Sequence, residues 1–228
     1  MPESYEASFP GFEGHSEENQ TRSGIALSTD RVHWRHHCWA TPPEIDDRDV
    51  ILFPEKIGGR YAILRRPLQF VSPDHSAIRS INAPGICLSF SDDMQTWTEP
   101  TLIARGEQDW EGGRIGGSTP PIKTEHGWLV FYHGVENVHP PTRRVCYRLG
   151  AMLLDLEDPT RILARTKNFI MEPETYYERF GLYIPNVIFA TGNVVRDGLL
   201  YLYYGVCDTA IALATVPLDE VVAHVMGE

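Results

Sequence analysis

The sequence predicts an all-β protein with the architecture of a β-propeller, in which about three and a half blades are present. Three observations predict this class: a repeat of about sixty residues, strand-like segments separated by turn residues within each repeat, and a shortage of helical patterns. With 228 residues and 42% hydrophobic residues, the chain has the size and composition of one globular domain covering 1–228.

The first series of repeated strands begins with a small residue and continues with apolar residues. Its members start at Gly24, Gly85, Gly150 and Ala210, which are 61, 65 and 60 residues apart. In the first two members, an acidic turn and a tryptophan follow the strand. Similar strands at a similar spacing indicate repeated structural units.

The second series lies between the members of the first, and each member is a turn glycine followed by an aromatic-rich strand. The glycines are Gly59, Gly127 and Gly198, which are 68 and 71 residues apart. Each follows a short strand-like segment and therefore predicts a hairpin. Together the two series indicate four antiparallel strands per repeat, which is typical of a propeller blade. A single convincing amphipathic helical stretch covers 218–225.

The beginning of the chain contains only part of a blade. Residues 5–9 and 24–34 are similar to the later strands of a repeat whose first strand is missing, whereas a closed propeller needs at least about four blades. We therefore expect the chain to be short at its N-terminus. The edge strands of an incomplete ring invite pairing with another chain, so we also expect a homo-oligomer.

Composition excludes several classes of partner. The net charge of -11 disfavours binding to nucleic acid or to an anionic membrane. Apolar runs stay well below the roughly 20 residues of a membrane helix, and the start of the chain has no secretory pattern, so we expect a cytoplasmic protein. Cys38, Cys87, Cys146 and Cys207 form no C-x-x-C pair, which predicts free thiols and no metal site.

Candidate binding residues follow the second series of strands. Aligned on the turn glycines, Arg65, His133 and Tyr204 occupy the same offset, six residues on. Nearby positions add three further candidates, Arg66, Arg114 and Asp208. Arginines and a histidine in an acidic protein suit an oxyanion such as phosphate, and a carboxylate suits sugar hydroxyls. The alternative interpretation is ordinary solvated charge at strand ends.

Several long motifs resemble glycoside hydrolase family 130. They occur in the same order as in that family, and the similarity runs from about residue 5 to residue 225. The segments that carry it are FPEKIGGRY at 53–61, LRRP at 64–67, RIGGSTPPIKTEHGW at 114–128, YHGV at 132–135 and YYGVCD at 203–208.

The resemblance implies a five-bladed β-propeller with its active site at the axis. It also implies phosphorolysis of β-mannosides with inversion, in which inorganic phosphate is the co-substrate, α-mannose 1-phosphate is the product and no cofactor is needed. Arg66 and His133 would bind phosphate together with Arg65, and Tyr204 and Asp208 would hold the sugar. The substrates expected from the resemblance are therefore a β-mannoside oligosaccharide and phosphate.

One part of the family pattern has no counterpart here, and this leaves alternatives open. The family's general acid is an aspartate in a Glu-Asp-Pro-Arg-like motif before a strand similar to residues 5–9, and the chain begins after that motif. No catalytic residue is therefore assigned. The alternatives to a phosphorylase are a β-mannosidase that uses water, and a sugar-binding fragment with impaired catalysis, since general acid catalysis contributes roughly 10² to 10⁴ in rate.

Overall fold

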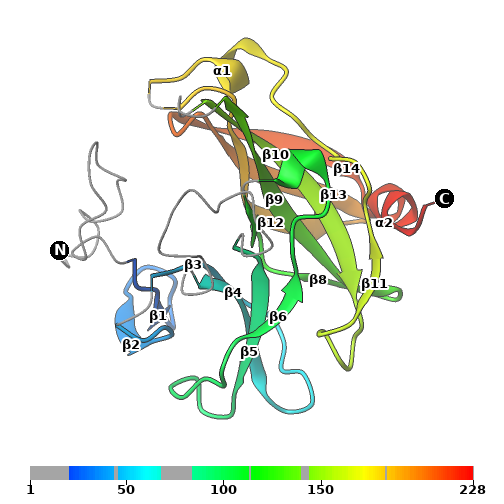
Figure 1. Ribbon diagram of the computed structural model, residues 1–228. Helices are drawn as coiled ribbons and strands as arrows, with labels where there is room; N and C mark the ends of the chain where they lie inside the picture. The colour runs from blue at the N-terminus through cyan, green and yellow to red at the C-terminus, as the bar shows by residue number, and fades with distance from the viewer. Residues whose placement is uncertain are drawn as a thin grey trace.

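The computed structural model describes residues 21–43, 46–67, 84–112, 114–139, 144–182 and 184–227. Antiparallel strands make up most of the regular structure of these residues, and they form four sheets (Figure 1). The prediction of an all-β protein is therefore confirmed. The strand expected at 5–9 lies outside the described residues.

The four sheets follow one another along the chain. Sheet I contains β1 (Gly24–Leu27) and β2 (Arg35–Trp39), and sheet II contains β3 (Asp47–Leu52), β4 (Tyr61–Pro67), β5 (Ile86–Ser91) and β6 (Thr101–Ala104). Sheet III contains β7 (Arg114–Gly117), β8 (Ile122–Thr124), β9 (Gly127–His139), β10 (Arg144–Leu154) and β11 (Ile162–Arg165). Sheet IV contains β12 (Ile188–Arg196), β13 (Leu199–Val206) and β14 (Ala210–Pro217).

Helices are few and short, as the sequence predicts. A 3-10 turn covers Asp109–Glu111, α1 covers Tyr176–Arg179, and α2 covers Leu218–Met226 at the amphipathic stretch. The left-handed residue Gly227 ends α2. Among the described residues, we find no helix with the length and hydrophobicity needed to cross a lipid bilayer.

Turn residues with positive φ close two of the three hairpins that the glycine series predicts. Gly58 and Gly59 have φ values of 56° and 82°, and they connect the bridge partners Ile57 and Arg60. Asp197 and Gly198 have φ values of 51° and 77° between β12 and β13. Two such residues in succession match the twist of the flanking strands, which explains why these hairpins form here.

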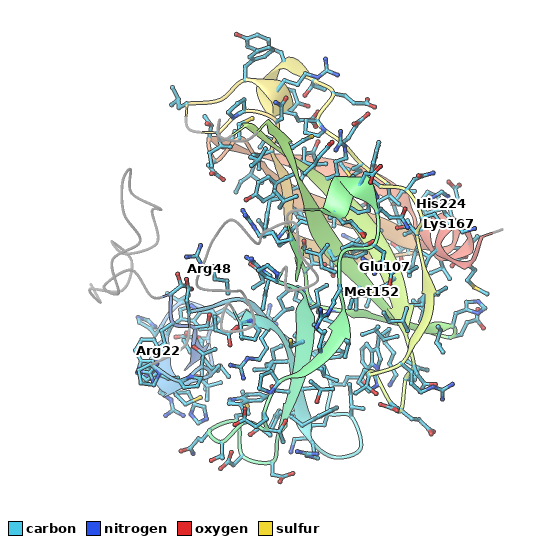
Figure 2. The ribbon with its side chains drawn as sticks, in the orientation of Figure 1. Arg22, Arg48, Glu107, Met152, Lys167 and His224 are labelled. Atoms are coloured by element: carbon cyan, nitrogen blue, oxygen red, sulfur yellow. The ribbon has the colours of Figure 1, made fainter. Side chains whose placement is uncertain are left out.

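Sheets II, III and IV pack face to face through two apolar clusters. The first lies between sheets II and III and includes Leu64, Trp128 and Met152, the last of which is labelled in Figure 2. The second lies between sheets III and IV, includes Phe131 and Leu202, and is completed by valines of α2. Sheet III is therefore covered on both faces, and its long strands β9 and β10 connect the two halves of the described structure.

Candidate active site

A cavity of about 300 Å³ lies where sheets II, III and IV meet. Strands β3, β4, β7, β9, β10 and β12 contribute to its wall, together with the turn between β13 and β14. Figure 2 labels Arg48, on the β3 part of this wall. The lining is rich in charged and aromatic side chains, and consists of Arg48, Asp49, Arg66, Arg114, His133, Tyr147, Ile184, Val187, Phe189 and Asp208.

Asp49 joins two of the predicted site residues. Arg66 donates a hydrogen bond through Nε to Asp49 Oδ2 at 2.5 Å, and His133 Nε2 lies 3.6 Å from the same oxygen. The side chains of Arg66 and His133 are only 7% and 1% exposed. Both are therefore held in place by the interior while they still face the cavity.

A β-bulge turns Asp49 toward the cavity. Strands β3 and β4 pair Arg48 with Arg66 and Ile51 with Leu64, so two residues of β3 oppose one residue of β4. Asp49 takes a φ of 55°, in the left-handed region that costs a non-glycine residue roughly 1 kcal/mol. Bulges of this kind redirect a side chain beside an active site.

Gly116 leaves room for the charged cluster. It lies on β7 opposite His133. A Cβ atom at this position would lie 2.6 Å from His133 Cε1 and 2.9 Å from Arg66 Nε, and it would overlap Asp49 Oδ2. Only glycine therefore allows these three side chains to meet at their present distances.

Burial and charge set the protonation states of the cluster. Burial lowers the pKa of His133 to about 3 and outweighs the opposite effect of Asp49, so the ring is neutral near pH 7. Burial alone would raise the pKa of Asp49, but Arg66, with help from His133 and Arg114, holds that pKa below its usual value. The cavity thus contains a neutral histidine and an ionised aspartate.

Aromatic rings and a second carboxylate complete the wall. The His133 ring centroid lies 4.5 Å from that of Phe189 and 5.9 Å from that of Tyr147, and Arg114 donates to the Tyr147 hydroxyl. Asp208, with a φ of 52°, lies in the tight turn after β13. Cationic, aromatic and acceptor groups suited to an anion and to a sugar therefore face one space.

The structure brings together four of the six binding residues predicted from the sequence. Arg66, Arg114, His133 and Asp208 all line the cavity. The other two, Arg65 and Tyr204, point away from it and have partners in the protein interior.

The hairpin registers correct the expected equivalence of Arg65, His133 and Tyr204. The residue pairs that close the three hairpins are Ile57 with Arg60, Thr124 with Gly127, and Arg196 with Leu199. Gly59 and Gly198 are therefore loop residues, whereas Gly127 already belongs to its strand. The glycine alignment is wrong by one residue, and a shift of one residue moves a side chain to the opposite face of a sheet.

In the corrected register, Arg65, Tyr132 and Tyr204 are equivalent, and each pairs with a buried acid. Arg65 Nε donates to Asp47 Oδ2 at 2.6 Å, and the hydroxyls of Tyr132 and Tyr204 donate to Glu111 at 2.7 Å and Glu178 at 2.9 Å. We call these three residues and their acids, Asp47, Glu111 and Glu178, the closed face, because their side chains pair in the interior and do not line the cavity. The glutamates also accept backbone hydrogen bonds that cap the turn at Asp109–Glu111 and helix α1.

Sequence reasoning missed Arg48 and Asp49. They lie in the first half of β3, in the charged segment that comes shortly before the FPEKIGGRY motif. Strand alternation could have found Arg48, because it pairs with Arg66 and shares its face. It could not have found Asp49, because the bulge breaks the alternation.

A family model described as beta-1,4-mannooligosaccharide phosphorylase matches residues 14–227 of this chain. The chain belongs to glycoside hydrolase family 130. Its similarity to a 1,2-beta-oligomannan phosphorylase of a Thermoanaerobacter species is 36% identity over 95% of this chain and 65% of the relative. Its similarity to a beta-1,4-mannooligosaccharide phosphorylase of Ruminococcus albus is 32% identity over 78% of this chain and 50% of the relative.

A solved structure of this family has the same fold. Beta-1,2-mannobiose phosphorylase from Listeria innocua, in complex with beta-1,2-mannobiose, superposes with a TM-score of 0.77 and 35% identity, over 92% of this chain and 55% of that one. The chain thus spans about half to two thirds of the length of the family 130 relatives it matches. Among the described residues, no group of three or more His, Cys, Asp or Glu side chains is arranged to hold a metal ion.

Proposed function

We propose that this family 130 chain binds inorganic phosphate and a β-mannoside in the cavity, and that the protein cleaves the mannoside by phosphorolysis. Mannose would be released as α-mannose 1-phosphate, with inversion at the anomeric carbon. The observation that carries the proposal is the convergence of Arg48, Arg66, Arg114 and His133 on one cavity in a chain of net charge -11. Guanidinium groups bind oxyanions through paired N–H donors, and a neutral imidazole adds one more donor.

The division of the cavity follows from the chemistry of its walls. The arginines and His133 would hold phosphate, and Asp208 would accept hydrogen bonds from sugar hydroxyls beside the rings of Tyr147 and Phe189. Arg65 and Tyr204 would stabilise the fold instead, since both donate hydrogen bonds to buried acids. We assign no general acid among the described residues.

Product release tests the reaction directly. The purified chain is incubated with β-1,2-mannobiose or β-1,4-mannobiose, with and without phosphate, and mannose 1-phosphate and free mannose are measured. Phosphate-dependent mannose 1-phosphate supports the proposal, whereas mannose released at the same rate without phosphate indicates a hydrolase. The two linkages are both included because relatives of each specificity match this chain.

Phosphate binding tests the site independently of turnover. Calorimetric titration with inorganic phosphate should show that Arg66→Ala weakens affinity about 10- to 100-fold, as expected for the loss of a charged hydrogen bond. Arg196→Ala is the matched control, because Arg196 is 80% exposed on β12 and pairs with Asp197. Equal phosphate affinity in both variants would contradict the assignment. The cytoplasmic location and the homo-oligomer stay predictions, which cell fractionation and light scattering would test.

A further inference from the structure

Asp49 is an anionic group inside a cavity that otherwise suits an anion. Its side chain is 12% exposed, and it belongs to the cavity lining with Arg48, Arg66 and Arg114. Only one of its oxygens, Oδ2, makes the hydrogen bond to Arg66. An anion bound by these arginines would therefore also meet a carboxylate.

The surroundings of Asp49 keep it ionised. Burial would raise the pKa of its carboxyl group, but Arg66, His133 and Arg114 outweigh burial and lower that pKa. The other titratable side chains of the described lining are those of Arg48, Tyr147 and Asp208. An ionised carboxylate can only accept hydrogen bonds.

We propose that Asp49 makes the cavity select oxyanions that carry a proton, so that it binds inorganic phosphate or arsenate and rejects sulfate. This inference rests on the proposed phosphate site. Near pH 7, phosphate and arsenate still have a hydroxyl group that can donate to Asp49, whereas sulfate has acceptor oxygens only. A site that accepts from a ligand hydroxyl strongly rejects an analogue that lacks the hydroxyl, because two desolvated acceptors are then left facing each other.

The backbone around Asp49 supports a role in the cavity. A φ of 55° is unfavourable for aspartate, and the bulge that imposes it breaks the pairing of β3 with β4. Gly116 provides the space that the carboxylate occupies. Strain of this kind persists where the surrounding structure holds it, and it concentrates at ligand sites.

Anion titrations of the whole chain test the inference. Calorimetry at pH 7 and constant ionic strength is carried out with phosphate, arsenate and sulfate. We expect arsenate to bind like phosphate and sulfate to bind at least about 100-fold more weakly. Binding of sulfate within about threefold of phosphate would overturn the inference without any variant.

Asp49→Asn isolates the carboxylate. Asparagine accepts a positive φ readily and has nearly the same shape, but its amide can donate to sulfate. We expect the ratio of phosphate to sulfate affinity to fall below about tenfold. Asp197→Asn is the matched control: it makes the same change at another positive φ, of 51°, in a carboxylate that is 93% exposed and pairs with Arg196 away from the cavity lining. Its ratio should stay that of the unmodified chain.

The outcomes separate the inference from the proposed function. Phosphate binding with no discrimination against sulfate, or an unchanged ratio in Asp49→Asn, overturns the role of Asp49 and leaves the phosphate site standing. Failure of the unmodified chain to bind any of the three anions overturns the phosphate site, and the role of Asp49 with it.

Discussion

The two faces of strand β4 carry the same pair of residue types in different surroundings. On one face Arg65 pairs with Asp47, and their side chains are 3% and 0% exposed. On the other face Arg66 pairs with Asp49, and their side chains are 7% and 12% exposed beside the cavity. Both aspartates come from β3, so each pair joins the same two strands.

The difference between the pairs shows how the neighbouring charges change the role of an ion pair. Burial outweighs the attraction of Arg65 and raises the pKa of Asp47, whose Oδ1 has no hydrogen-bond partner within the part of the chain that the structure describes. Burial also acts to raise the pKa of Asp49, but Arg66, with help from His133 and Arg114, outweighs it, so that this pKa is lowered. The pair of Arg65 and Asp47 supports the fold, whereas the pair of Arg66 and Asp49 also presents charge to a ligand in the cavity.

Among the variants that test the difference between the two pairs, Arg65→Met should have the largest effect. The change leaves Asp47 buried without a partner, and we expect the free energy of unfolding in urea to fall by about 3–5 kcal/mol. Where the variant is still folded, phosphate affinity should be unchanged, because Arg65 lies off the cavity. A loss of phosphate affinity at unchanged stability would instead place Arg65 in the site, as the family resemblance suggested.

The pH dependence of folding stability tests the protonation state of His133 on the cavity face. The unfolded chain binds a proton at His133 below about pH 6.5, but the folded chain does so only near pH 3, so stability falls as pH falls between these values. From pH 7 to pH 5 the loss at this residue should be about 2 kcal/mol. Scanning calorimetry should find a smaller loss in His133→Gln.

The matched control for this measurement is His126→Gln. His126 is 45% exposed in the turn before β9, so its replacement should leave the pH dependence of the melting temperature as it is. The same pH dependence in His133→Gln and in the unmodified chain would show that the ring is not held neutral by burial.

Adding one methyl group on β7 tests the packing of the cavity face. In Gly116→Ala the new Cβ would displace Asp49, Arg66 and His133, so phosphate affinity should fall by about tenfold or more, with about 1–3 kcal/mol lost in stability. Gly117→Ala is the control, because its Cβ meets the apolar side chains of Ile51 and Leu64. It should cost stability alone. Equal phosphate affinities in the two variants would contradict the packing argument.

The smallest expected effect is on the closed face of sheet IV. Tyr204→Phe removes the hydrogen bond to Glu178 and should lower the free energy of unfolding by about 1 kcal/mol. Binding of β-1,2-mannobiose by calorimetry should stay the same. Weaker mannobiose binding with unchanged stability would return Tyr204 to the sugar site.

Sequence alone predicted the repeat, the strand class and four polar residues of the cavity wall, which are Arg66, Arg114, His133 and Asp208. One glycine pair and one Asp-Gly pair mark hairpins through local conformational preference, so the positions of β4 and β13 could be read from them. The hairpin loops also contained the information for the correct register. Gly-Gly and Asp-Gly fill two loop positions, whereas Gly127 follows the loop residues Glu125 and His126.

Only the tertiary structure decided which of two neighbouring side chains reaches the cavity. Side chains alternate along a strand, so an error of one residue exchanges Arg65 for Arg66, and a bulge set by non-local pairing brought in Asp49. Residues from 48 to 208 meet because three sheets pack through their apolar faces. The sequence specifies the chemistry of these groups, but the distances between them depend on packing between strands that are far apart in the sequence.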